Sequence, residues 1–327
     1  MNKKNILWIY LLLVIGLILI LTNSCNKNDD NELATCSDGI QNQGETGIDC
    51  GGPCPPCISA RDSLIIDYNN NYLGSNITNL GWTGSISTCD AGTVPQSTHD
   101  KVIMRLNYFR RLVGLNDNTT LDVSQFAKFQ ETALMMAANG QLDHYPPNTW
   151  TCWTQAGSDG AAQSNLVLTH STPAITIFIQ DPGSNNFDCG HRRWILHSVK
   201  TKFSYGTTNT SMALGVIGVA DGNTNIPPFI AYPPKGYIPQ QLVFSRWSFG
   251  IPGANFSSAN VSMTGSNGTI ILNVVSTTAN YGDKTIVWEP QGIITNSPND
   301  LSYTVTVSGI TNAPQSSYTY TVIIIKP

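Results

Sequence analysis

A short segment near the N-terminus brings cysteines together at close spacing. Four of the eight cysteines in this 327-residue chain fall within residues 36–57, a segment too short and too polar to bury a hydrophobic core. Disulfides stabilise small units that lack such a core, so two disulfides are expected here. The cysteines concerned are Cys36, Cys50, Cys54 and Cys57.

The same segment carries hard oxygen ligands between glycines that permit tight turns: Asp38, Asn42, Glu45 and Asp49. Calcium loops are built from such oxygens in such turns. Three interpretations remain open, namely a calcium site, a disulfide-stapled spacer without metal, and a zinc site of four cysteines. An oxidising compartment disfavours zinc because it leaves few free thiolates. The segment resembles a short Cys/Asp/Gly-rich repeat of bacterial surface proteins and, more loosely, the calcium-binding repeats of Notch-type receptors.

The first residues have the pattern of a lipoprotein secretion signal. Two lysines precede an uncharged, apolar stretch, Ile6–Leu21, and Ser24 stands directly before Cys25. We expect removal of residues 1–24 as a signal peptide and a lipid on Cys25 that binds the protein to a membrane. The alternative is an uncleaved anchor helix, because the apolar stretch is only slightly shorter than the roughly 20 residues that span a bilayer.

The segment after this cysteine predicts where the protein is displayed. Residues 25–35 are polar and acidic, which is typical of a flexible tether. Acidic residues directly after a lipidated cysteine resemble the surface-export signals of some Gram-negative lipoproteins, so we expect display on the outer membrane. Without the two signal-peptide lysines, the 17 basic residues fall to 15 against 21 acidic ones, a net charge of −6. The chain therefore lacks the basic surface of a nucleic-acid-binding protein.

Three cysteines remain outside residues 36–57 and the lipidation site, so one of them is expected to be unpaired. We expect a Cys89–Cys152 disulfide and a free, buried thiol at Cys189. Cys189 lies two residues before His191, but side chains this close on an irregular turn seldom point at one another. The sequence has no Gly-x-Ser-x-Gly nucleophile elbow and no His-Glu-x-x-His zinc helix.

The elements that must position these residues are helices followed by a strand. Apolar residues recur at helical spacing over residues 100–114 and 121–139, and a glycine follows or closes each run. Residues 174–180 suit a short helix or strand, and residues 213–220 form an apolar run typical of a buried strand. This order within residues 60–222 indicates the α+β class.

Four short motifs follow one another along residues 97–220. They are Arg105-Leu-Asn-Tyr-Phe-Arg110, Asp143-His144, Ser164-Asn165-Leu166 and Gly190-His191-Arg192. In this order and spacing they resemble the motifs of the CAP superfamily, which comprises cysteine-rich secretory proteins, antigen 5 and pathogenesis-related proteins, with a bacterial lipoprotein branch. The resemblance implies an α-β-α sandwich with a cleft on one face.

The resemblance also implies a set of cleft residues. Members of the family line the cleft with two histidines and two acids, and the histidines can hold a divalent metal. Carried over, the histidines fall on His144 and His191 and one acid falls on Asp181. The other acid belongs where this chain has Ser164, and a hydroxyl cannot act as a general base unaided. The histidines and Asp181 remain a candidate zinc site with one position open to water.

Three functions fit this reduced set of residues. The missing acid favours a non-enzymatic binding module for an unknown lipid, peptide or glycan. The alternative is a metal-assisted, peptidase-like hydrolase that uses the implied zinc site. A structural envelope protein with an unused cleft is the third.

The pattern changes to period two after a proline-rich connection, over residues 226–327. Apolar residues alternate with Ser and Thr from Leu301 to Val307, and Asn267-Gly268 is a hairpin turn signal. A further strand is expected at Gln241–Trp247. The sequence predicts an all-β sandwich domain, with Trp247 and Trp288 in its core.

Overall fold

The computed structural model describes residues 35–219, 221–277 and 280–327. Contacts divide the chain into two compact units, Met1–Ser59 and Ala60–Pro327. The predicted signal peptide, the lipidation site Cys25 and all but the last residue of the tether lie outside the described residues. Within the described ranges, the search for a helix that is both apolar and long enough to cross a membrane finds none.

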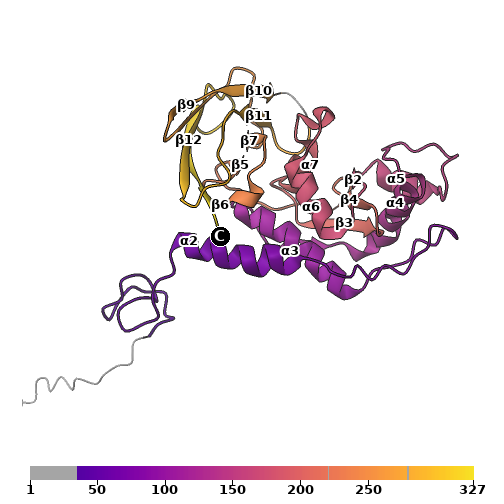
Figure 1. Ribbon diagram of the computed structural model, residues 1–327, viewed down its shortest axis with the longest axis horizontal. Coiled ribbons are helices and arrows are strands. Elements are labelled where there is room, and N and C mark those ends of the chain that lie inside the picture. The colour runs from indigo at the N-terminus through magenta and orange to yellow at the C-terminus, as the bar shows by residue number, and fades with distance from the viewer. Residues whose placement is uncertain (1–34, 220, 278–279) are drawn as a thin grey trace, which may run out of the picture. The chain divides into compact units, whose positions relative to one another are not determined.

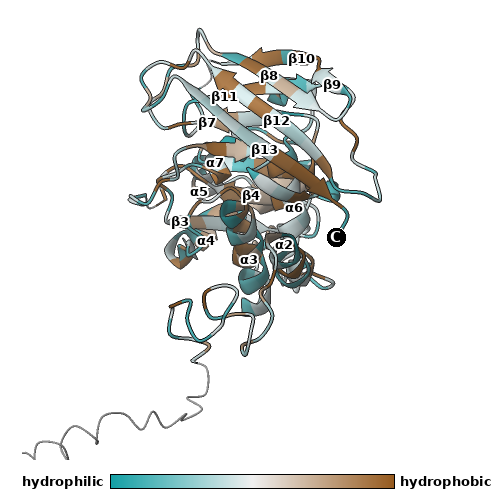
Figure 2. Ribbon diagram, turned by 90° about the vertical axis from the view of Figure 1, so that its left-hand side faces the viewer, coloured by the Kyte–Doolittle hydropathy of each residue, from teal (hydrophilic) through white to brown (hydrophobic). Residues whose placement is uncertain are grey.

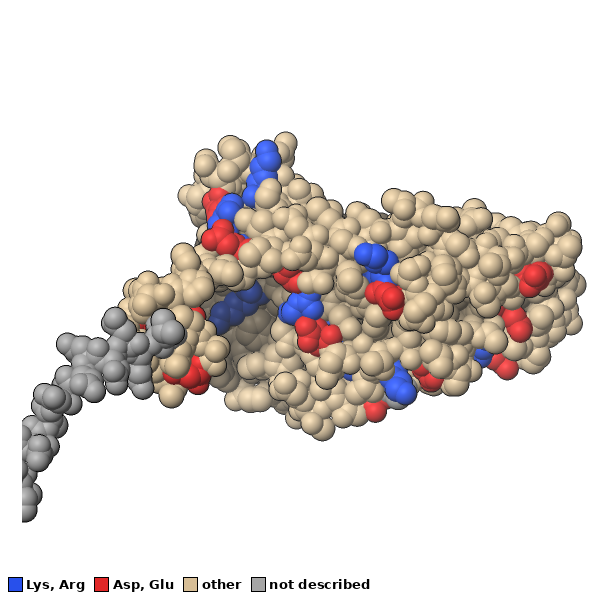
Figure 3. Space-filling model, turned by 90° about the horizontal axis from the view of Figure 1, so that it is seen from below, with Lys and Arg blue, Asp and Glu red and all other residues tan. Residues whose placement is uncertain are grey.

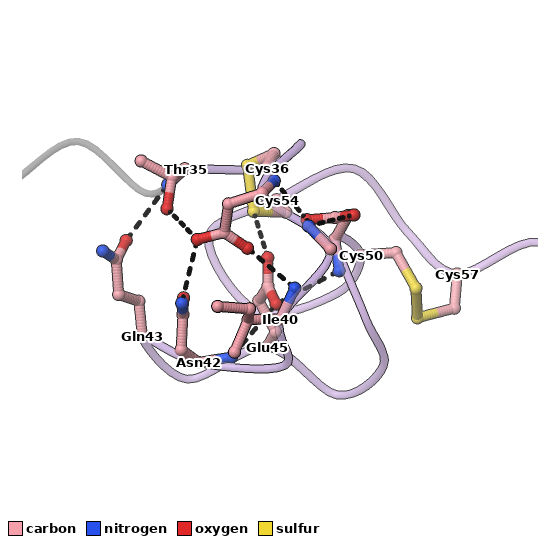
Figure 4. Close-up of a disulfide and its surroundings, with 12 residues drawn as sticks. Thr35, Cys36, Ile40, Asn42, Gln43, Glu45, Cys50, Cys54 and Cys57 are labelled. Carbon is pink, nitrogen blue, oxygen red and sulfur yellow. Dashed lines mark hydrogen bonds between the residues drawn. A yellow bond between two sulfur atoms is a disulfide. The ribbon is translucent and has the colours of Figure 1, made fainter.

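In the N-terminal unit, residues 35–59 form a series of turns held by two disulfides (Figure 4). Cys36 pairs with Cys54, and Cys50 pairs with Cys57, which confirms the two disulfides expected in this segment. The backbone reverses sharply at Gly51, whose φ of 75° is a conformation that glycine adopts without strain.

In the second unit, residues 60–222 place helices on both faces of a small sheet (Figure 1). The helices are α2 (Ala60–Asp67), α3 (Gln96–Leu112), α4 (Phe126–Asn139), α5 (Gln155–Ala161), α6 (Ser171–Gln180) and α7 (Gly190–Ile195). The four-stranded sheet has the order β1-β3-β4-β2, and β1 is parallel to β3 while the other pairs are antiparallel. Its strands are β1 (Thr120–Leu121), β2 (Ser164–Val167), β3 (Lys202–Thr207) and β4 (Met212–Gly215).

Alternate side chains of β4 pack in different clusters. Met212 and Leu214 belong to the large core that includes residues of α3 and α6. Ala213 packs in a smaller cluster with Met135 and Met136 of α4. Since successive side chains of a strand point to opposite faces, the sheet lies between α3 and α6 on one side and α4 and α5 on the other.

Residues 226–327 form two further sheets whose apolar faces pack together (Figure 2). The four-stranded sheet has the order β10-β11-β7-β5, and the five-stranded sheet has the order β6-β13-β12-β8-β9. Their strands are β5 (Ile230–Tyr232), β6 (Gly236–Pro239), β7 (Trp247–Gly250), β8 (Asn260–Gly265), β9 (Gly268–Ile270), β10 (Leu272–Ser276), β11 (Thr285–Pro290), β12 (Leu301–Ser308) and β13 (Ser317–Ile325).

Contacts between aromatic side chains join these two sheets. The rings of Trp247 on β7 and Tyr303 on β12 lie 6.3 Å apart, and the Trp288 indole on β11 donates to the Met263 sulfur on β8 (3.1 Å). Both tryptophans are fully buried, as expected. The core that they form continues into α3 and α6, so residues 60–222 and 226–327 share one hydrophobic core.

The α+β class is confirmed, and most predicted elements are present with shifted ends. Residues 174–180 are helical, and the expected hairpin joins β8 to β9 through Ser266 and Asn267, with Gly268 at φ 100° as the first residue of β9. The prediction of a strand at Gln241–Trp247 is wrong. Residues Gln240–Leu242 form a 3-10 turn instead, and the Leu242 carbonyl accepts a hydrogen bond from the buried Tyr232 hydroxyl (2.8 Å).

Charged side chains are sparse on the molecular face shown in Figure 3 and often lie next to a group of opposite sign. This agrees with a composition of only 12% charged residues.

Candidate functional site

The structure brings the two implied histidines to one cavity. His144, in the loop after α4, and His191, on the first turn of α7, both line a cavity of about 350 Å³. Ser164, at the start of β2, lines it as well. Asp181 is fully buried and is not among the residues that line the cavity.

Asp181, which does not line the cavity, orients the side chain of His191. Its Oδ1 accepts from His191 Nδ1 (2.8 Å), and its Oδ2 accepts from the backbone N–H groups of His191 (2.9 Å) and Arg192 (3.3 Å). A carboxylate can only accept, so the neutral imidazole carries its proton on Nδ1 and leaves the Nε2 lone pair free. Asp181 therefore fixes both the start of α7 and the tautomer of His191.

His144 is oriented in the same way by a different acceptor. Its Nδ1 lies 2.9 Å from the carbonyl oxygen of Ala161 at the end of α5. A carbonyl oxygen can only accept, so Nδ1 is the donor and Nε2 of the neutral ring is again unprotonated. In the neutral form of each cavity histidine, Nδ1 is thus fixed by the protein and Nε2 is unprotonated.

Ser164 has no basic partner among the described residues. Its hydroxyl donates to the carbonyl oxygen of Gly160 (2.8 Å), and the residue is only 5% exposed. A serine nucleophile needs a base that takes its proton, so this hydroxyl has the geometry of a structural group.

A second hollow of similar volume, about 350 Å³, adjoins the first. The two hollows share His144, His191, Asn185 and Asn186. The wall of the second contains the apolar side chains of Leu142, Leu166, Phe178 and Pro182. The histidines therefore lie where two hollows meet, and we call the two together the cleft.

Sequence reasoning missed the part of the cleft that comes from the C-terminal sheets. Asn280 and Tyr281, between β10 and β11, line the first cavity together with residues of α7. Nothing in the sequence marks these two residues, because their contribution depends on how the sheets pack against α7.

In the disulfide-linked segment, the predicted calcium ligands bind the segment's own backbone (Figure 4). Asp49 accepts from the N–H groups of Asp38 and Gly39, and Glu45 Oε2 accepts from those of Asn42 and Asp49. The carboxylate of Asp38 accepts from Thr35, Asn42 and Ile40, and these hydrogen bonds lower its pKa. These contacts stabilise the turns, and calcium binding stays a prediction.

One described group of potential metal ligands is compact, namely Cys36, Glu45 and Cys54. The two sulfurs form a disulfide and carry no thiolate charge, so this group does not have the chemistry of a metal site. His144, His191 and Asp181 do not form a compact group of three among the described residues.

The other cysteines behave as expected. Cys89 and Cys152 form a disulfide, which confirms that prediction. Cys189 is free and fully buried among the described residues, and burial raises the pKa of its thiol. It is not a reactive thiolate, in keeping with the role of a small apolar residue.

No protein-family model matches the sequence, and no curated protein matches it either.

Proposed function

We propose that this chain is an exported lipoprotein, anchored through Cys25, whose CAP-type cleft binds an extracellular or envelope ligand without transforming it. The observation that carries this proposal is that the buried carboxylate of Asp181 already accepts three hydrogen bonds from the protein. Ser164 stands where a second acid is expected, and it is bonded to Gly160. Apart from the two histidines and the carboxylates of Asp143 and Asp188, the described lining of the cleft consists of uncharged polar, aromatic and aliphatic groups.

The layered arrangement supports membership of the CAP superfamily. Helices α3 and α6 lie on one side of the small sheet, and α4 and α5 lie on the other. His144 and His191 lie together at one cavity although 47 positions separate them in the sequence.

A ligand screen tests the binding role. The full chain in detergent is heated with neutral hexasaccharides, a hexapeptide pool or phospholipid vesicles. We expect at least one class to raise the unfolding midpoint of the wild type and of His170→Ala, a histidine outside the cleft. The double variant His144→Ala/His191→Ala should not respond. No shift with any class would contradict a binding function.

Lipid labelling tests the anchor. We expect radiolabelled palmitate to enter the wild-type protein in Gram-negative cells and not the Cys25→Ser variant. Added protease should digest the wild type on intact cells if it is displayed at the surface. Labelling of Cys25→Ser at the wild-type level would contradict the proposed lipidation site.

One observation favours the metal-assisted hydrolase as a second candidate. Metal-binding histidines usually donate their second ring nitrogen to a carboxylate or a carbonyl, and His191 and His144 do this with Asp181 and Ala161. Zinc titration by calorimetry tests it, with one site expected in the wild type and in His170→Ala and none in His144→Ala/His191→Ala. Peptide or ester hydrolysis must then depend on zinc. Activity that survives the double substitution would exclude this cleft as its source.

A further inference from the structure

The C-terminal sheets contribute an aromatic wall to the cleft. Tyr281 follows β10, lines the first cavity and is 43% exposed. Trp194 on α7 lines the same cavity, as does Tyr145, which directly follows His144 and is 80% exposed. Exposed aromatic rings around one cavity are unusual on a surface that needs only to be soluble.

Tyr281 is held in place by contacts with α7. Its ring lies against Gly190, where a Cβ atom would be 3.1–3.3 Å from three ring carbons. The guanidinium of Arg193 also lies near this ring, 5.8 Å from its centroid. The glycine at position 190 therefore leaves room for the ring, since a Cβ atom there would require the ring to shift by a few tenths of an ångström.

Asp283 anchors the same loop two residues further on. Its carboxylate accepts from the backbone N–H (2.8 Å) and the hydroxyl (3.0 Å) of Ser198, just after α7. Its carbonyl oxygen accepts from Arg193 (2.9 Å). These bonds fix the position of Tyr281 before any ligand arrives, and a preorganised side chain loses less entropy on binding.

The groups in the cavity wall are those that recognise uncharged, hydroxyl-rich molecules. Side-chain amides come from Asn165, Asn185, Asn186 and Asn280. Among the described lining residues, Asp188 is the one carboxylate, its Oδ1 accepts from the Ser276 hydroxyl, and neither lysine nor arginine takes part.

Each ligand class makes a different demand on this wall. A sugar hydroxyl donates and accepts at once, as an amide side chain does, and the C–H face of a pyranose packs flat on an aromatic ring. An anionic ligand would need cationic side chains, and a lipid chain would need a continuous apolar wall. The amides and aromatic rings of the first cavity meet the first demand.

We propose that the ligand of the cleft is a neutral oligosaccharide and that Tyr281 of the C-terminal sheets is the platform on which one sugar ring stacks. This proposal rests on the binding function proposed above. It gives the C-terminal sheets a direct part in ligand recognition.

Calorimetry with the full chain tests this assignment. The probes are the hexamers of glucose with β-1,4 and α-1,4 linkages, of xylose and of N-acetylglucosamine, with a heparin hexasaccharide, a hexapeptide pool and phosphatidylglycerol vesicles as comparisons. We expect a neutral hexamer to bind the wild type and Tyr281→Ala to bind it about tenfold more weakly. Tyr281→Phe, which keeps the ring, should stay within about threefold of the wild type.

Two further variants show whether a loss of affinity in Tyr281→Ala comes from the missing ring or from a disturbed fold. Tyr281→Leu keeps apolar contact with Gly190 but removes the flat ring, and it should also lose affinity. Ile271→Ala removes an exposed side chain (75%) at the other end of the same hairpin and should bind as the wild type does.

The outcomes distinguish the oligosaccharide proposal from the binding function on which it rests. Equal affinity of Tyr281→Ala and the wild type for a neutral hexamer would overturn the role of Tyr281 and leave the binding function intact. Binding of the peptide or heparin without any neutral hexamer would overturn the oligosaccharide class alone. Vesicle binding would do so only if His144→Ala/His191→Ala abolishes it, because the lipid on Cys25 can itself bind vesicles. Binding of no probe would count against both.

Discussion

Asp181 ends α6 in the left-handed region, with φ 55°, and this turn aims its carboxylate at the first turn of α7. The family resemblance implies an acid at this position but not what the acid contacts. Three donors surround it, all from residues 191 and 192. A carboxylate that binds the second ring nitrogen of a cavity histidine can set the orientation and the basicity of the ring without contacting a ligand.

Replacing Asp181 with asparagine should destabilise the protein by about 2–3 kcal/mol. An amide has one accepting oxygen, and its NH₂ group would face an N–H donor, so at least one buried donor loses its partner. Urea unfolding measures the change. The matched control is Asp143→Asn, because Asp143 is an exposed carboxylate beside the same cleft. A variant as stable as the control would show that these buried bonds contribute little.

At the residue scale, the sequence limits the possibilities without deciding among them. The Cys89–Cys152 disulfide is one of three pairings that the three remaining cysteines allow, and the shared cavity of His144 and His191 is implied by the family resemblance and not by spacing. The place of Tyr281 could not be predicted, because it depends on a contact with Gly190 about 90 positions away.

At the scale of elements, α4 lies directly on β3 because Gly206 has no side chain. A Cβ atom at this glycine would lie 2.2 Å from both the Phe129 carbonyl oxygen and the Gln130 nitrogen, which are backbone atoms of α4. Substitution Gly206→Ala should therefore cost about 3 kcal/mol, since helix and strand must move apart.

Chemical denaturation of Gly206→Ala checks this expectation. The control is Gly74→Ala, where the nearest atom to the new Cβ lies 3.5 Å away, an ordinary contact distance. The control should be neutral or slightly stabilising. Equal stability of both variants would mean that α4 and β3 are not held at this distance.

A second prediction at this scale concerns pH. His99 on α3 stacks on Phe126 (4.5 Å between ring centroids) and bonds to the Tyr205 hydroxyl (2.9 Å). Burial lowers its pKa below the ordinary 6.5, and the nearby Asp100 opposes this only in part. Between the lowered pKa and 6.5 the unfolded chain binds more protons than the folded one, so stability falls as the pH falls through this window.

His99→Gln should weaken this pH dependence, because glutamine does not titrate. The free energy of unfolding is measured by urea titration from pH 7.5 to pH 5, and the variant should show a shallower loss than the wild type. His197, whose pKa burial also lowers, remains in both proteins and supplies a common background. An identical slope in the two proteins would exclude His99 as a source of acid sensitivity.

Element prediction succeeded where periodicity is long and failed where tertiary contacts decide. The 3.6-residue pattern located α3 and α4 because each buries one stripe over several turns. The strand expected over 213–220 stops at Gly215. The Phe129 ring leaves no room there for a Cβ atom. The N–H groups of the next two residues, Val216 and Ile217, donate to the Gln163 carbonyl oxygen instead of continuing the strand.

At the scale of the whole second unit, Arg192 connects the helices to the C-terminal sheets. This fully buried side chain donates to the carbonyl oxygens of Ile179, Gln180 and Arg246 and to the Ser248 hydroxyl. Its guanidinium also lies 4.8 Å from the Tyr232 ring centroid. The spacing of apolar residues changes from helical to alternating near residue 225, but these contacts and the shared core join the residues on both sides of that position.

Arg192→Lys therefore tests whether the second unit unfolds as one body. A lysine keeps the charge but lacks the planar fork, so most of these buried acceptors lose their donor, and we expect a loss of about 2–4 kcal/mol. Far-UV circular dichroism follows the helices, while fluorescence follows the buried Trp247 and Trp288 when Trp82, Trp150, Trp153 and Trp194 are replaced by phenylalanine in both proteins. If the shared core makes one cooperative body, both signals should change together at a lower urea concentration than in the wild type.

The control for this substitution is Arg61→Lys, because Arg61 forms a half-exposed ion pair with Asp300 (2.9 Å) that also joins an early helix to the late sheets. An exposed pair of this kind contributes about 0–1 kcal/mol, so the control should unfold nearly as the wild type does. Separate transitions for the helical and tryptophan signals in Arg192→Lys would show that the two parts are stable alone. A single, earlier transition would instead mean that a cleft with walls from both parts is stabilised by the whole unit.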